Sequence, residues 1–165
     1  EEFCTEISPT RSICTHYGNA TKSNTAASLV ADLCSDGSRV AVYWYNLYAP
    51  CLSAFLPMFS EGKIPEDLAI GSEIPRDDSP WWVFHNIERK IRQGDRINSE
   101  AVQQIRTRWI DLQDEFLLTA YDLAKHVYPM IGESGENTAT KMLTEYMKES
   151  FNRAMVVARN ILVEL

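Results

Sequence analysis

The sequence predicts an α+β protein in which strands occupy the first part of the chain and helices the second. Residues 26–45 hold two apolar runs separated by Asp36-Gly37, a pair typical of hairpin turns. After residue 79, apolar residues recur at intervals of three and four, the period of a helix face. We therefore expect a single domain, with a strand-rich segment at residues 1–78 and a helical segment packed on it at residues 79–165.

The strand-rich segment contains three candidate strands. Residues 26–34 and 39–45 are expected to pair antiparallel through a tight Asp36-Gly37 turn, and residues 10–16 form a shorter candidate beside them. Residues 39–45 are apolar on both faces. We therefore expect the sheet to be covered on two sides, as in a layered structure.

The stretch with the fewest charges, residues 40–60, is interpreted as buried core. It includes Asn46 and two prolines, whereas a membrane-spanning helix needs about 20 helix-compatible apolar residues. Pro50 and Pro57 make a long regular element unfavourable, so a buried turn or short helix is predicted there. A polar loop is expected to follow at residues 61–78.

Three helices are predicted in the second segment. Ser79 is a suitable N-cap and Pro80 a suitable first helical residue, and this helix should end before Gly94. The second helix should run from about Asn98 to Pro129, and the third should begin near Asn137. Both carry long apolar stripes, which predict an antiparallel helical hairpin.

The charge distribution bears on possible partners. The net charge is −7, and residues 1–78 account for −6 of it. Nucleic acid is therefore not an expected partner, because phosphate binding requires a basic face. Neither a membrane nor a cofactor is expected, and the sequence has no glycine-rich phosphate loop.

The four cysteines, at positions 4, 14, 34 and 51, include no C-x-x-C pair. Cys14, Cys34 and Cys51 lie in apolar runs, so inert buried thiols are favoured over a disulfide framework. Cys14 and His16 would share one face of a strand, but no second pair stands at ligand spacing. No metal site is therefore expected.

Other candidate chemical groups have simpler structural interpretations. Trp81-Trp82 could form a stacking platform for a ligand, but core packing is favoured. His85 lies on an amphipathic helix and is expected to be a hydrogen-bonded structural histidine. No nucleophile motif such as G-x-S-x-G accompanies any histidine.

Four motifs, in this order and spacing, resemble the C-terminal third of cysteine dipeptidases of the dipeptidase A type, a family related to the secernins. The motifs are Arg11-Ser12-Ile13-Cys14, Trp44-Tyr45-Asn46, Pro50-Cys51-Leu52-Ser53-Ala54-Phe55-Leu56-Pro57 and Ser79-Pro80-Trp81-Trp82-Val83-Phe84. The resemblance covers residues 10–118 and includes Trp109 in the following helix. It implies the C-terminal portion of a four-layer αββα sandwich of the N-terminal-nucleophile hydrolases.

The resemblance also implies a reaction. Such enzymes hydrolyse dipeptides with an N-terminal cysteine whose own α-amino group acts as the base. This sequence begins Glu1-Glu2-Phe3. The nucleophile is thus expected in a missing N-terminal segment of the same protein, and the 165-residue chain is expected to be inactive alone.

One site residue is carried over from the resemblance. Arg11 corresponds to a late active-site arginine of related amidases and would bind the substrate carboxylate bidentately. A salt bridge to a neighbouring acidic loop is an equally good interpretation of Arg11. Two other functions remain open: a non-catalytic binding module that uses its helical hairpin, and a secernin-like protein with a role other than peptide cleavage. The sequence indicates neither a compartment nor an oligomeric state.

Overall fold

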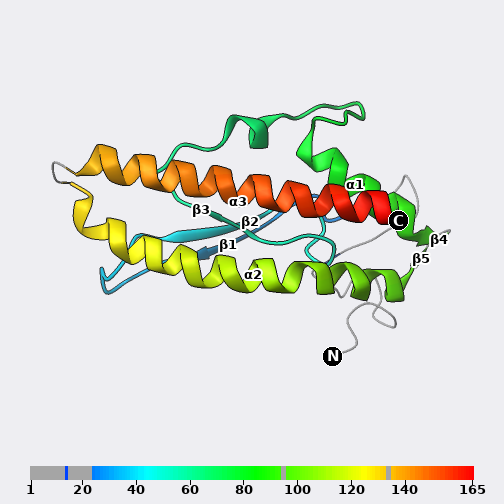
Figure 1. Cartoon of the computed structure of the whole chain (residues 1–165), viewed down its shortest axis with the longest axis horizontal. Coiled ribbons are helices and arrows are strands. Elements are labelled where there is room, and N and C mark those ends of the chain that lie inside the picture. Colours follow the sequence, from blue (N-terminus) through cyan, green and yellow to red (C-terminus); the bar gives the residue numbers. More distant parts are fainter. Residues whose placement is uncertain (1–13, 15–23, 94–95, 133–134) are drawn as a thin grey trace.

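The computed structural model describes residues 14, 24–93, 96–132 and 135–165, and confirms the α+β class. Figure 1 shows two long antiparallel helices lying along a small sheet, with a shorter helix near the C-terminus. The elements in chain order are β1 (Ser28–Asp32), β2 (Val42–Asn46), β3 (Leu56–Met58), the 3₁₀ helix η2 (Glu66–Ala69), α1 (Pro80–Ile91), β4 (Arg92–Gln93), β5 (Arg96–Ile97), α2 (Ser99–Val127), the 3₁₀ helix η3 (Tyr128–Met130) and α3 (Glu136–Glu164).

β1 and β2 form the predicted antiparallel hairpin, in a sheet of order β1-β2-β3. The ladder ends at the pair Asp32↔Val42, so residues 33–41 make a longer connection than the tight turn predicted. The backbone of Val40 explains this difference. Its N–H donates to the Ala124 carbonyl of α2 and its carbonyl accepts from Arg39 Nη1, so neither group remains for the ladder.

Two further strand predictions have different outcomes. The candidate at residues 10–16 lies outside the described residues apart from Cys14, which is in a bend. The turn or short helix predicted from Pro50 to Ser60 was wrong for β3, which pairs with β2 through Trp44↔Pro57 and its neighbours. Proline is tolerated there because β3 is an edge strand of the described sheet and needs no N–H on its outer side.

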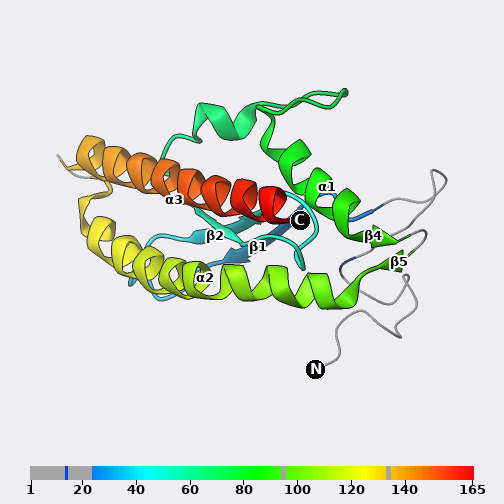
Figure 2. The ribbon, with the colours of Figure 1, turned by 45° about the vertical axis from the view of Figure 1, so that its right-hand side comes forward.

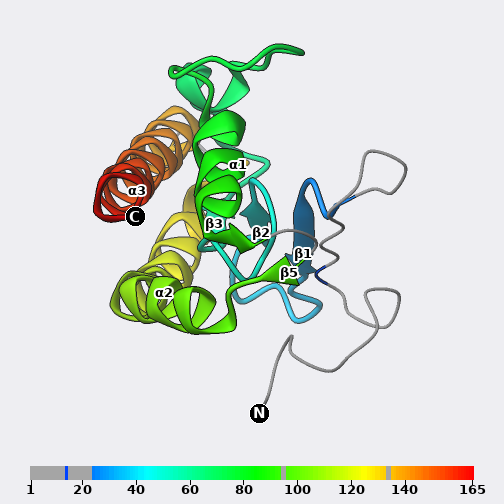
Figure 3. The same cartoon turned by 90° about the vertical axis from the view of Figure 1, so that its right-hand side faces the viewer.

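The helices cover one face of β2 and β3. Val42, Trp44 and Asn46 are buried on that face, and the Trp44 ring packs edge-on against Tyr121 of α2 at 5.9 Å. On the other face Tyr43 and Tyr45 are only half-buried. Helices of the second segment pack on one face of β2, as expected, and the cover expected on its other face stays a prediction. Figure 3 shows β1 on the side of the sheet away from α2 and α3.

The predicted helix starts are confirmed, but α1 and α2 differ in how their first turns are capped. Asn98 caps α2, since its Oδ1 accepts from the backbone N–H groups of Glu100 and Ala101 at 3.0 and 3.2 Å. Ser79 occupies the cap position of α1, yet only its backbone carbonyl accepts, from Trp82 and Val83. Its hydroxyl is buried and finds no hydrogen-bond partner in the described part of the chain.

α2 and α3 form the predicted antiparallel hairpin, and α1 packs on α3 (Figures 1 and 2). The hydrophobic core contains residues of the sheet, of the segment after β2 and of all three helices. Among the described residues, neither the two long helices nor α1 carries an apolar stretch sufficient to cross a bilayer.

Candidate functional site

The segment from Asn46 to Pro57, which contains the motif at residues 50–57, is organised by one buried amide. Asn46 Oδ1 accepts from Tyr48 N at 3.1 Å and from Ser53 Oγ at 2.9 Å. Its Nδ2 donates to the carbonyl of Ala54 at 3.2 Å. Asn46 is fully buried, so these bonds satisfy an amide that burial would otherwise strongly disfavour. The hydrogen bonds of Asn46 therefore hold the segment in one conformation.

Two side chains of α2 fix the same segment from outside. Trp109 Nε1 donates to the Leu52 carbonyl at 3.1 Å. Gln113 pairs with both backbone groups of Phe55: its Oε1 accepts from the N–H at 2.7 Å and its Nε2 donates to the carbonyl at 3.3 Å. Gln113 thus bonds the backbone N–H and carbonyl of Phe55 as a neighbouring strand would, and it connects the motif at residues 50–57 to α2.

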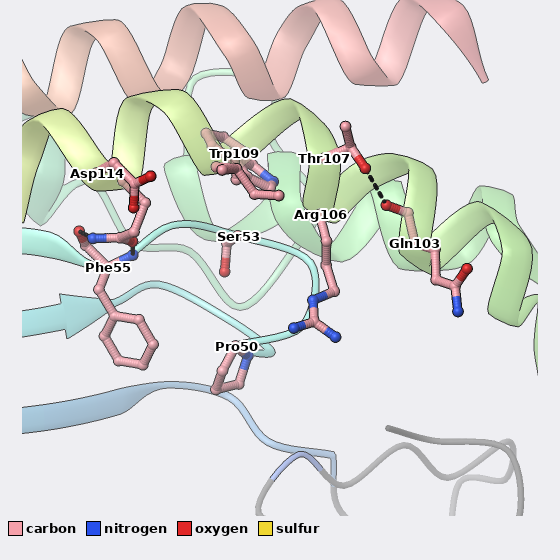
Figure 4. A pocket seen from close by; sticks show the side chains of 10 residues that line it. Pro50, Ser53, Phe55, Gln103, Arg106, Thr107, Trp109 and Asp114 are labelled. Carbon is pink, nitrogen blue, oxygen red and sulfur yellow. Dashed lines mark hydrogen bonds between the residues drawn. The ribbon is translucent and has the colours of Figure 1, made fainter. Parts of the chain in front are cut away.

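A groove of about 550 Å³ lies between this segment and α2 (Figure 4). In that view Arg106 extends from α2 toward Pro50, with Ser53 and Phe55 along the same wall. A volume in this range suits a small-molecule ligand. The lining residues are Pro50, Ser53, Phe55, Gln103, Arg106, Thr107, Trp109, Ile110, Gln113 and Asp114.

An aromatic cluster lies beside the start of the same segment. The ring of His85 on α1 stacks on Tyr48 with centroids 5.8 Å apart and on Trp82 at 5.0 Å. Trp81 meets Tyr48 edge-on at 5.3 Å. The two indole N–H groups bond backbone carbonyls, of Ala26 and Ser72, at 3.0 Å each. The tryptophans therefore brace α1 against the preceding loops, consistent with a packing role.

The environment of His85 differs from the expected one. Its Nδ1 is buried and has no hydrogen-bond partner among the described residues, whereas a hydrogen-bonded histidine was expected. Ring stacking holds it instead. Burial lowers the pKa of His85, and the positive charges of Arg89 and Arg92 lower it further. Burial likewise raises the pKa of Tyr48.

A buried ion pair lies at the end of α1. Glu88, only 2% exposed, pairs with Arg92 one turn further along the chain, which is 18% exposed. Asn24 Nδ2 also donates to Glu88 Oε1 at 3.3 Å. The pair thus links the loop before β1 to the end of α1. This acidic side chain is satisfied within the fold, so it is a structural group rather than a candidate catalytic acid.

The cysteines differ from their prediction in burial. Cys14, Cys34 and Cys51 are half-buried rather than buried. The Sγ atoms of Cys14 and Cys51 lie 3.2 Å apart, although 37 positions separate them in the sequence. Cys34 Sγ instead donates to Asp36 Oδ1 at 2.8 Å, and this bond, together with those from Ser38, holds the pKa of the exposed Asp36 at about 2.

The structure brings together residues that sequence patterns did not single out. Arg11, the one predicted substrate-binding residue, lies outside the described residues. Arg106 and Gln113 were missed because each is a polar residue at the edge of the apolar stripe, where a solvated side chain is the usual interpretation. A polar Asn46 within an apolar run was the available signal for the buried amide. In the part of the chain that the structure describes, no three His, Cys, Asp or Glu side chains are grouped as metal ligands would be.

Comparison with protein-family models, curated proteins and solved structures found no match for this chain.

Proposed function

We propose that this chain is the C-terminal part of a cysteine dipeptidase of the N-terminal-nucleophile type. The observation that carries the proposal is the segment 46–57, which contains one of the four motifs of the resemblance and the end of another. This segment is fixed by Asn46 and by two side chains of α2, and it forms one wall of a groove of about 550 Å³. A groove of this volume accommodates a small peptide.

The layer arrangement supports the same proposal. An αββα sandwich requires a helical layer on the outer face of each sheet and a second sheet on the inner face. Here helices cover one face of β2 and β3, while β1 is open on both faces: Leu29, beside Tyr45, is 61% exposed and Val30, beside Trp44, is 53% exposed. In the proposed enzyme, the N-terminal segment of the same protein supplies the facing sheet and the nucleophile.

The proposed chemistry is amide hydrolysis in two steps. The N-terminal thiolate attacks the peptide carbonyl and the α-amino group, titrating near pH 8, carries the proton to the leaving amine. Water then releases the acyl group from sulfur. This chain would contribute binding: Arg11 pairs with the free carboxylate of the dipeptide, and Arg106 supplies a second positive charge at the groove.

The test is dipeptide hydrolysis by the complete protein, carrying its processed N-terminal cysteine. We expect activity there, none in the cysteine-to-serine variant and none in the 165-residue chain alone. Arg11→Lys should keep the fold but lower kcat/KM about 30-fold or more, because a bidentate charge pair is typically worth at least about 2 kcal/mol. Unchanged kcat/KM in folded Arg11→Lys and Arg11→Ala enzymes would make Arg11 structural.

Arg106 has a matched control two residues away. Arg106→Ala should raise KM for dipeptides, whereas Arg108→Ala should not, because Arg108 pairs with Glu164 at the surface and does not line the groove. Absence of dipeptide hydrolysis by the complete, folded protein would instead favour the binding module. Exposed apolar residues on the helical hairpin, such as Leu118 at 70% and Val163 at 85%, are the observation in its favour.

A further inference from the structure

Cys14 and Cys51 pack against the hydrophobic core as a pair of neighbouring thiols, and the proposed hydrolysis gives them no role. Their Sγ atoms are 3.2 Å apart, and the two cysteines are not joined by a disulfide in this structure. A disulfide bond is about 2.05 Å long, so the two sulfurs would need to approach by about 1.2 Å. Side-chain rotation and small backbone shifts deliver movements of this size.

The surroundings of the pair suit reversible chemistry. Both side chains are half-buried, so solvent-borne reagents reach them while the protein keeps them close together. Both also lie near enough to Tyr48 to influence its phenol electrostatically, which places them beside the aromatic cluster. The Cys34 thiol, by contrast, donates a hydrogen bond to Asp36 in the connection between β1 and β2.

We propose that Cys14 and Cys51 form a reversible disulfide that fastens the chain at residue 14 to the segment 46–57. The oxidant is a low-molecular-weight disulfide such as glutathione disulfide. One cysteine thiolate attacks it, forming a mixed disulfide and releasing one glutathione thiolate. The second cysteine thiolate then attacks the protein-bound sulfur and releases the other glutathione. The two cysteines lose two electrons and two protons, and two glutathione thiols receive them.

The bond would act on the wall of the groove. Cys51 follows Pro50, which lines the groove, and precedes Leu52, whose carbonyl is held by Trp109. Oxidation would therefore add a covalent brace to a segment that hydrogen bonds already fix on its α2 side. This inference goes beyond the proposed function and does not depend on it, because the thiol pair exists whether or not the chain belongs to a peptidase.

Thiol counting in the 165-residue chain tests the proposal. After equilibration with glutathione disulfide and removal of small thiols, we expect reactive thiols to fall from the four in the sequence to two. Peptide mapping should find Cys14 linked to Cys51. The Cys34→Ser variant should still lose two thiols, whereas Cys14→Ser and Cys51→Ser should form no internal disulfide. A linkage that involves Cys4 or Cys34, a bond between two molecules, or retention of all four thiols would overturn the proposal.

Thermal unfolding gives a second measurement. The linkage closes a long loop, so the oxidised protein should melt about 5–15 °C higher than the reduced protein. Reduction with dithiothreitol should reverse the increase. Cys34→Ser should keep the difference and Cys51→Ser should lose it. Equal melting temperatures in oxidised and reduced wild type, with the Cys14–Cys51 link present, would show that it does not brace the fold and would contradict that part of the proposal.

Discussion

Ser53 Oγ donates a hydrogen bond of 2.9 Å to Oδ1 of Asn46, and both side chains are buried. The pair connects the end of β2 to the segment that leads into β3. Ser53 Oγ also lies 3.1 Å from the Ala49 carbonyl, so the hydroxyl bridges two parts of one turn. The turn is thus closed by side chains rather than by a regular backbone ladder.

We predict that Asn46→Ala destabilises the protein by about 3 kcal/mol, because several buried backbone and hydroxyl groups lose their partner together. Ser53→Ala should cost less, about 1 kcal/mol, since the amide keeps its bonds to Tyr48 and Ala54. Urea unfolding of both variants measures the difference. Equal costs for the two substitutions would contradict the central role of the amide.

Gly62 is predicted to be a position where an added side chain destabilises the fold. A Cβ placed there would overlap Met147 Cε and lie 3.2 Å from Leu143 Cβ and 3.3 Å from Thr144 N, all on α3. Gly62→Ala should therefore cost about 1–3 kcal/mol through overpacking. The matched control is Gly71→Ala, where no atom of the described residues lies within 4 Å of the added Cβ. If both variants unfold at the same urea concentration, the close approach of this loop to α3 is wrong.

The ion pair of Glu88 and Arg92 should be worth far more than a surface pair. Glu88→Ala leaves a largely buried guanidinium without its partner, and we expect a loss of about 3–5 kcal/mol. Glu115 and Arg153 provide the comparison, because both side chains are more than 40% exposed. Glu115→Ala should cost no more than about 1 kcal/mol. Chemical denaturation at fixed salt concentration compares the two variants directly.

Stability should fall as the pH drops below about 6.5, the ordinary pKa of histidine. Because burial lowers the pKa of His85 in the folded state, the unfolded chain takes up its proton at a higher pH than the folded chain does. The contribution of His85 is therefore complete above pH 6.5 and declines until the folded-state group also protonates. The positive charges of Arg89 and Arg92 act in the same direction.

The measurement is the free energy of unfolding at pH 7.5 and pH 5.5. His85→Gln should reduce the difference between the two values. His126→Gln, on the exposed side of α2, is the control and should leave the difference close to that of the wild type. A His85→Gln protein with the full wild-type difference would show that another group causes the pH dependence.

The helices were predictable because their signals are local. The cap at Asn98, the proline at position 80 and the apolar stripes lie within the elements that they define. The end of the hairpin ladder was not predictable, since it depends on a bond from Val40 to Ala124, far along the chain. The same holds for β3, whose Pro57 is acceptable only because of its edge position.

In the candidate site, too, local features were predictable from the sequence and long-range contacts were not. The motif at residues 50–57 drew attention to a segment that lines the groove, but the groups that fix it, Trp109 and Gln113, come from a helix more than fifty residues later. The burial of the cysteines was predicted wrongly because an apolar run signals a core only where another element covers it. For Arg11 the prediction stays open, since that residue lies outside the described part of the chain.

The placement of α3 has a consequence for how this protein folds. Neighbouring strands β1, β2 and β3 pair in sequence order, so the sheet assembles from contacts close along the chain. The contacts of α3 with the loop after β3 span more than eighty positions, as between Lys63 and Thr144. Distant contacts require the closure of long loops. We therefore expect α3 to dock late, after the β1–β2 hairpin has formed. Substitutions in the contact between Gly62 and α3 should then accelerate unfolding while leaving the refolding rate nearly unchanged.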